Sequence, residues 1–242
     1  MIQVFRKELN SFLNSLIAYV VIGFFLAAIG LLVWVFPETS VLDSEYAGLD
    51  TLFTFAPYVF VFLIPAITMR SFSEETKLGT LELLLTKPLT DWDVVLGKFL
   101  ASFALVCIAL VPTVLYYFTV SRLGNPAGNL DTSGIAGSYI GLLLLAAIFC
   151  AVGVLASGLT SNQIVAFVLA SFTCFLLYTG FDSLSTIPAT AQFALSLQSA
   201  GILSHYESIS KGVIDSRDVV YFLSVCAGVL LLTKTILSSR SW

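Results

Sequence analysis

The chain has 242 residues, of which 58% are hydrophobic and only 11% are charged, and its mean hydropathy is +0.98. A soluble domain is about one quarter charged, because every face of it needs a polar surface. The composition therefore disfavours a soluble enzyme and predicts an all-α membrane protein. With 15 acidic and 11 basic residues the net charge is −4, which disfavours a nucleic-acid partner.

Residue types that build catalytic and metal sites are scarce. His205 is the single histidine of the sequence, and the four cysteines lie inside apolar segments without a CxxC pair. The sequence also lacks the phosphate-binding pattern GxxxxGK[ST] of self-powered ATPases. We therefore predict no catalytic residue, no cofactor-binding residue and no metal site in this chain.

The first predicted element covers residues 2–15. Ile2, Phe5, Leu9 and Phe12 recur there at helical spacing, with polar residues between them. This pattern is typical of an amphipathic helix that lies at the membrane interface. An ordinary cytoplasmic start to the first span is the alternative.

Six apolar segments are long enough to cross a bilayer as helices. They are separated by a tight hairpin at 160–163, a loop at 70–96, an outer loop at 182–218 and shorter connections. We predict a single transmembrane domain over residues 1–242, with spans at 16–36, 51–69, 97–120, 138–157, 164–181 and 219–237.

Basic residues indicate the orientation, because Lys and Arg near span ends stay in the cytoplasm. With a cytoplasmic amino terminus, eight basic residues fall in cytoplasmic segments and three in outer segments. Both termini are therefore predicted to be cytoplasmic. The eight are Arg6, Lys7, Arg70, Lys77, Lys87, Lys98, Lys234 and Arg240, and the three are Arg122, Lys211 and Arg217.

Ionisable side chains are predicted only near the span ends. Lys98 and Lys234 are expected to extend toward the inner membrane surface, as long basic side chains do. Ion-coupled transporters carry ionisable groups at depth, so this mechanism is disfavoured. Gly137 with Gly141 and Gly153 with Ser157 predict close helix contacts at both ends of the fourth span.

The loop at 70–96 contains signals for short helices. Ser71 with Glu74 fits a capping box, and Gly79 fits the left-handed residue that ends a helical turn. Thr80 is suited to cap a helix over 81–85, which Pro88 stops.

Leucines gather on one side of this predicted helix. Either a groove on a partner protein would cover them, or they would lie on the inner leaflet or against the helix bundle. Thr90 with Asp93 fits a second capping box, at the start of the third span.

The loop also carries a family resemblance. Its residues Glu74, Glu75, Gly79, Thr80, Leu81, Glu82, Leu83, Leu84 and Pro88 resemble the signature loop of ABC-2 type permeases, the membrane subunits of ATP-driven exporters. The six spans, the amino-terminal helix and the long last outer loop match the same type V exporter-like architecture. The resemblance implies that the helix around Thr80 to Leu85 is a coupling helix that docks on a separate ABC ATPase dimer, which would hold ATP and Mg. These residues, with Leu85, would form the interface with that ATPase.

The segment from His205 to Ser224 resembles a branch that includes the gliding-motility-associated permeases of the GldF type. This implies a bacterial inner-membrane subunit that couples the ATPase to export or to gliding machinery. The implied partners also include a second permease copy or related chain and an accessory membrane protein with an extracytoplasmic domain. A membrane scaffold that transmits mechanical work and transports nothing is the alternative.

Within the outer loop, two interpretations remain open for His205, Tyr206 and Glu207. They form part of an outer gate, or they belong to a solvated loop. Asp215 with Asp218 fits a capping box at the start of the sixth helix.

Overall fold

The computed structural model describes residues 1–44, 46–80, 90–126, 128–186, 194–212 and 215–239. These residues form helices and no β-strand, which confirms the all-α class. Six of the helices are long and apolar enough to cross a membrane, as the sequence predicts. The predicted coupling helix at 81–85 lies outside the described residues.

The helices follow one another with mostly short connections. In chain order they are α1 (Ile2–Leu13), α2 (Leu16–Trp34), α3 (Asp50–Thr68), α4 (Ser73–Lys77), α6 (Asp91–Leu110), η1 (Val111–Thr113), α7 (Val114–Leu123), α8 (Thr132–Leu159), α9 (Gln163–Phe175), η2 (Leu176–Gly180), α10 (Phe181–Ser185), α11 (Ala194–Ala200), α12 (Ile202–Ser210) and α13 (Ser216–Ser239).

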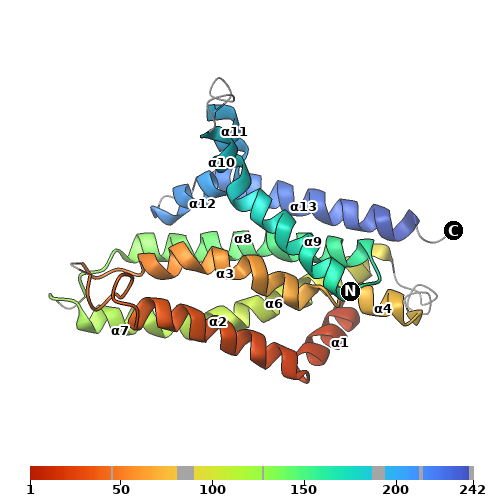
Figure 1. The fold of residues 1–242 in the computed structure, drawn as a ribbon, viewed down its shortest axis with the longest axis horizontal. Helices are drawn as coiled ribbons and strands as arrows, with labels where there is room; N and C mark the ends of the chain where they lie inside the picture. The colour runs from red at the N-terminus through yellow and green to blue at the C-terminus, as the bar shows by residue number, and fades with distance from the viewer. Residues whose placement is uncertain (45, 81–89, 127, 187–193, 213–214, 240–242) are drawn as a thin grey trace.

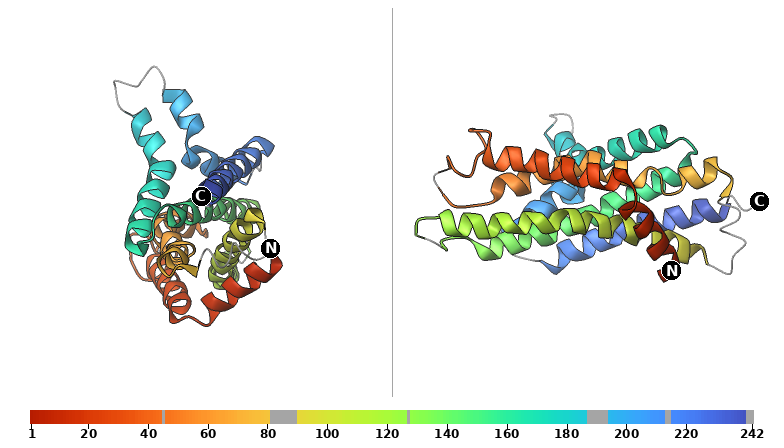
Figure 2. Two further views of the ribbon diagram at one scale, coloured as in Figure 1. Left: turned by 90° about the vertical axis from the view of Figure 1, so that its right-hand side faces the viewer. Right: turned by 90° about the horizontal axis from the view of Figure 1, so that it is seen from below.

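The long helices run side by side along the longest axis, and both chain termini lie toward the same end (Figure 1). We call this the proximal end and the opposite one the distal end. The turns between α2 and α3 and between α7 and α8 lie at the distal end, whereas α4 lies at the proximal end (Figures 1 and 2). An even number of spans places the termini together in this way.

Helix α8 is the centre of the bundle and the most deeply buried span. Its small residues make this position possible, because they let other backbones approach closely. A Cβ atom at Gly153 would collide with the Thr68 side chain of α3, and one at Gly137 would collide with the backbone of α12. The predicted small-residue pairs therefore lie at two helix contacts, one near each end of α8.

Two spans change helix type along their length. The third span runs from Asp91 to Leu123, and its α-helix gives way to the 3₁₀ turn η1 at Pro112. Proline lacks the N–H that an α-helix needs at this point. The fifth span runs from Gln163 to Ser185 and contains the π-helical turn η2. Such turns occur often at functional sites.

Most of the described residues of the predicted outer loop at 182–218 are helical. Helices α10 and α11 project from the side of the bundle, whereas α12 lies on α8 (Figures 1 and 2). Tyr206 of α12 explains this contact, since its ring packs over Gly141 and its hydroxyl donates to the Phe53 carbonyl at 2.7 Å. The distal part of the chain thus has a folded cap that the bundle supports.

One of the predicted capping boxes is wrong, and another forms only in part. Glu74 does not cap with Ser71, because its carboxylate accepts two hydrogen bonds from the Arg70 guanidinium at 2.8 and 3.0 Å. Asp215 accepts from the Arg217 N–H at 2.9 Å, but Asp218 faces His205 instead of closing the box. In both cases the acidic residue at the fourth position of the box pairs with another side chain instead of a backbone N–H.

Candidate functional site

A buried lysine joins three helices at the proximal end. The Lys98 side chain on α6 is 1% exposed, and its Nζ lies 3.1 Å from Glu8 Oε1 of α1 and 2.9 Å from Glu75 Oε2 of α4. The same ammonium donates to the Ser71 carbonyl at 2.5 Å. The ammonium thus has two hydrogen-bond acceptors, Glu8 and the Ser71 carbonyl, and a second carboxylate, Glu75, within ion-pair distance.

This finding corrects the sequence expectation for Lys98. The side chain does not extend to the membrane surface, because two carboxylates and a carbonyl meet it inside the bundle. The Phe72 ring adds a cation–π contact, with its centroid 5.0 Å from Nζ. Burying a charge is costly unless it is paired and hydrogen-bonded, and here it is both.

Lys7 completes the cluster at the surface. Its Nζ lies 3.1 Å from Glu75 Oε1 and 3.4 Å from Glu8 Oε1. Burial alone would lower the pKa of Lys7, but the hydrogen bond to Glu75 and the charges of Glu75 and Glu8 outweigh it and raise the pKa. Two lysines and two glutamates therefore form a charge-balanced group, which we call the proximal charge cluster: Lys7, Glu8, Glu75 and Lys98.

The helices of this cluster approach closely because of a neighbouring glycine. A Cβ atom at Gly97 would lie 2.8 Å from the Val4 side chain of α1, and Val4 is buried. Glu8 follows Val4 by four residues and so lies on the same face of α1. Gly97 thus lets α1 approach α6, and the adjacent Lys98 meets Glu8 one turn farther along α1.

Helix α4 is also attached to the bundle core. Phe72, which precedes it, is 1% exposed, and its N–H donates to the Ser157 hydroxyl of α8 at 3.3 Å. The Met1 amino group pairs with Asp93 at 2.8 Å, near the start of α6. The segment leading into residues 81–89 is held to α8 by the Phe72–Ser157 hydrogen bond and to α6 by the Lys98–Glu75 ion pair.

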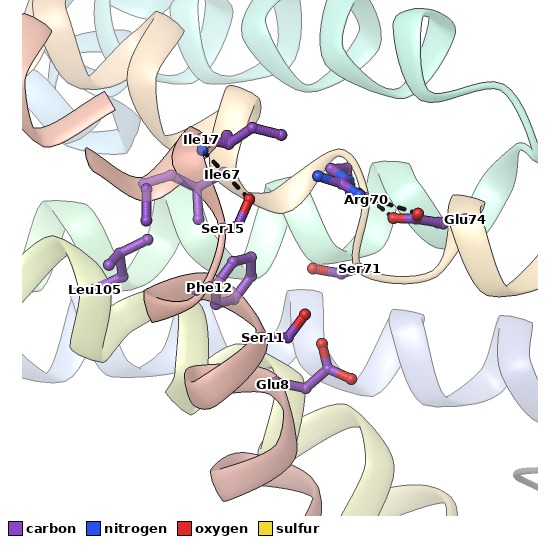
Figure 3. Close-up of a pocket in the computed structure, with 11 residues that line it drawn as sticks. Glu8, Ser11, Phe12, Ser15, Ile17, Ile67, Arg70, Ser71, Glu74 and Leu105 are labelled. Carbon is purple, nitrogen blue, oxygen red and sulfur yellow. Dashed lines mark hydrogen bonds and ion pairs between the residues drawn. The ribbon is translucent and has the colours of Figure 1, made fainter. Parts of the chain in front are cut away.

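A small cavity of about 90 Å³ lies beside the cluster, between α1 and the turn that precedes α4. Figure 3 shows Glu8 and Ser11 of α1 on one side of it and Ser71 with the Arg70–Glu74 ion pair on the other. Polar and charged residues thus share the lining of this cavity with apolar residues such as Phe12, Ile67 and Leu105.

The structure places four of the predicted interface residues at this end. Glu74 and Glu75 lie in α4, Gly79 has a φ of +67° as predicted, and the Thr80 hydroxyl donates to the Glu75 carbonyl at 3.4 Å. The box of Thr90 with Asp93 is confirmed at the start of α6. The predicted interface residues Leu81, Glu82, Leu83, Leu84, Leu85 and Pro88 lie outside the described residues.

Sequence reasoning missed the roles of Lys7 and Glu8. They are more than 60 residues from Glu75 in the chain, so no local pattern connects them. Two signals were nevertheless present. A lysine lies within an apolar span, which is costly unless a partner is available, and Glu8 lies on the apolar side of an amphipathic helix.

The three residues of the predicted outer gate lie on α12 and point to different partners. His205 Nδ1 lies 2.6 Å from Asp218 Oδ1, and its ring stacks on Tyr221 at 4.0 Å. Tyr206 is buried against α3 and α8, whereas Glu207 is exposed. They are part of a folded helix, so they do not form a solvated loop.

The sequence matches the family model of the ABC-2 family transporter protein over residues 44–236. No curated protein matches it. The matched region begins before α3, contains Glu75 and Lys98 of the proximal charge cluster, and ends within α13. The match therefore covers most of the chain and five of its six spans. The chain therefore belongs to the ABC-2 family transporter proteins and is a membrane permease component of an ABC transporter.

Proposed function

We propose that the proximal end of this permease receives the movement of a separate ABC ATPase and passes it to the membrane helices. The observation that carries this proposal is the position of Lys98, which joins α1, α4 and α6 through Glu8 and Glu75. Helix α4 leads directly into residues 81–89, the segment that resembles a coupling helix. A push on that segment would reach two other helices, because packed and paired elements move as rigid bodies.

The distribution of basic residues supports a cytoplasmic proximal end. Arg6, Lys7, Arg70 and Lys77 belong to elements there, whereas Arg122 and Lys211 belong to distal elements. Basic residues near span ends stay in the cytoplasm, where an ABC ATPase binds its nucleotide. In this orientation the ATPase would hold ATP and Mg, and the permease would contribute no catalytic residue.

The proposal includes further partners in a bacterial inner-membrane complex. Helix α9 exposes Ile164, Val168 and Phe172, which lipid alone or a second permease chain would cover. We infer a second copy or a related chain and an accessory membrane protein with an extracytoplasmic domain, because the resemblance of the outer segment implies them.

Copurification tests the ATPase interface. The chain is expressed in its native membrane with Glu82→Lys or Leu84→Asp, and the copurifying ATPase is identified by mass spectrometry and by its ATP hydrolysis. We expect both variants to lose the ATPase, since a reversed charge or a buried carboxylate opposes docking in an apolar groove. An equal yield of ATPase with wild type and both variants would overturn the proposal.

Matched controls lie at the distal end. Glu38→Lys makes the same charge change on an exposed residue of the turn between α2 and α3, and Leu42→Asp makes the same apolar-to-acidic change at a residue that is 61% exposed. Both variants are expected to retain the ATPase. Loss of the ATPase in the controls as well would indicate general misfolding.

The proposal also includes a role in gliding motility, which the resemblance of the outer segment implies. We expect cells without this chain to stop gliding, and wild-type chain but not the Glu82→Lys variant to restore movement. Normal gliding of the deletion strain would remove the motility role. It would leave the ATPase coupling untouched, because copurification tests that separately.

A further inference from the structure

A second cavity lies near the distal end, under α12. It has a volume of about 210 Å³, below the roughly 300–1,000 Å³ of pockets for drug-sized ligands. Its size suits a small molecule or a head group. Residues of α3, α8, η2 and α12 line it: Asp50, Phe53, Thr54, Tyr58, Ser138, Tyr178, Leu203, Tyr206, Glu207 and Ser210.

Three tyrosine rings from three different elements form one wall of this cavity. Tyr58 and Tyr178 meet edge to face with centroids 5.5 Å apart, and Tyr178 meets Tyr206 at 6.3 Å. Tyr178 belongs to the π-helical turn η2 and is 2% exposed, whereas Tyr58 is 43% exposed at the opening. The rings thus extend from the surface into the bundle.

The charged groups of the lining are all acidic. Asp50 and Glu207 contribute carboxylates, and the lining contains no lysine, arginine or histidine. Asp50 already has a partner, since its charge and a hydrogen bond to its carboxylate raise the pKa of Tyr46. Glu207 forms no ion pair with any residue that the structure describes. The carboxylate of Glu207 is therefore available to a cation.

The wall that carries Glu207 is held in place from two sides. On one side, the Ser138 hydroxyl of α8 donates to the Ser210 carbonyl at 3.3 Å, and Tyr206 donates to Phe53. On the other, His205 lies between Asp218 at 2.6 Å and the Ser199 carbonyl at 2.9 Å. Binding at such a wall costs little reorganisation, because its side chains are already ordered.

We propose that this distal cavity binds a small organic ammonium group, with the exposed Tyr58 ring contacting its apolar surface and Glu207 balancing its charge. Aromatic faces attract ammonium ions, and the attraction is stronger where water is excluded. An anion would meet two carboxylates, and an uncharged apolar ligand would leave Glu207 without a partner. The inference concerns the opposite end of the molecule from the ATPase and does not depend on that partner.

Calorimetry on the purified full-length chain in detergent tests the site with two probes. One probe is choline, and the other is its uncharged carbon isostere, dimethylbutanol. We expect choline to bind about tenfold more tightly than the isostere, the difference that a cation–π contact and one carboxylate provide. Equal affinities, or no binding of choline, would overturn the proposal.

Variants locate the binding. Glu207→Gln and Tyr58→Ala change exposed residues and are expected to weaken choline binding about tenfold. Glu38→Gln, on an exposed acidic residue outside this cavity, is the matched control and should leave the affinity unchanged. Glu207→Gln removes the charge of an exposed side chain and keeps its shape. Choline affinity that is the same in wild type and in this variant would therefore contradict the assignment.

A second arm distinguishes a lipid head group from a free ammonium compound. The chain is placed in nanodiscs of phosphatidylcholine or of phosphatidylglycerol and titrated with choline. Weaker apparent affinity in phosphatidylcholine at high salt, which screens the attraction of choline to the anionic phosphatidylglycerol surface, supports an ammonium site that lipid head groups reach. Equal affinity in both discs supports an ammonium site reserved for soluble ligands.

Discussion

At the scale of single residues, Lys98 shows how a membrane bundle accommodates a charge. An unpaired ammonium inside apolar surroundings would be far more costly than one at the membrane surface. Here Glu8, Glu75 and the Ser71 carbonyl replace the water that the surface would provide. A buried ion pair need not make the fold more stable than apolar residues in its place would. Removing one partner is nevertheless costly, because the other charges then lie buried without a counter-charge.

Removing the lysine should therefore be strongly destabilising. Lys98→Ala leaves Glu8 and Glu75 with an uncompensated charge in a largely buried site, and breaking a buried pair typically costs about 3–5 kcal/mol. We expect a clear drop in the temperature of thermal unfolding, measured in detergent by intrinsic fluorescence.

Lys77→Ala is the control for this loss of charge. Lys77 lies on α4 at the same end, is exposed, and forms no ion pair within the described residues. Its removal should change the unfolding temperature little, as surface charges usually do. Equal losses in the two variants would show that Lys98 has no special structural role.

At the scale of elements, the crossing of α1 over α6 depends on a missing side chain. Gly97→Ala brings a Cβ to 2.8 Å from Val4, so α1 must move away from α6. We expect destabilisation and faster proteolysis of the first 15 residues, although alanine is the better helix former by about 1 kcal/mol. Gly23→Ala in α2 is the control, because nothing lies within 4 Å of its Cβ, and it should be neutral or stabilising. The same effect at both glycines would contradict the close crossing.

The start of α8 provides a pH-dependent test. Hydrogen bonds from the Ser133 hydroxyl and the Gly134 N–H lower the pKa of Asp131 below its ordinary value. The stabilisation is therefore present above the ordinary pKa and is lost as pH falls through the folded-state pKa. Asp131→Ala should lower the unfolding temperature at pH 7, and the difference from wild type should shrink below about pH 4.

Asp43→Ala, in the turn between α2 and α3, tests whether the loss is specific to the cap. Its side chain is exposed and does not begin a helix. It should have little effect at any pH. A gap between Asp131→Ala and wild type that stays constant down to pH 2 would rule out the carboxylate as the source.

At the scale of the whole molecule, the two ends should face different compartments. Lys77→Cys is placed at the proximal end and Ser44→Cys at the distal end, both at exposed positions. A membrane-impermeant maleimide should label Ser44→Cys in intact cells and Lys77→Cys only after permeabilisation, because the excess of basic residues at the proximal end favours a cytoplasmic location for it. Wild-type chain with its four free cysteines gives the background. The reverse labelling pattern would place the coupling segment outside and end the ATPase proposal.

The sequence by itself determined the elements of this protein. Composition and segment length predicted an all-α fold with six spans, and local signals predicted the caps at Thr90 and Gly79, because apolar length and helix termini depend on neighbouring residues. Only the tertiary structure decided where the charges go. Lys98 meets Glu8 across 90 residues, and Asp218 meets His205 of another helix, because partners distant in sequence become close only after the helices pack. Glu74 differs, since its partner Arg70 is a local one, four residues earlier in the chain. The same packing created the distal cavity between four separate elements. No local sequence pattern predicts this cavity, because its lining residues are far apart in the chain.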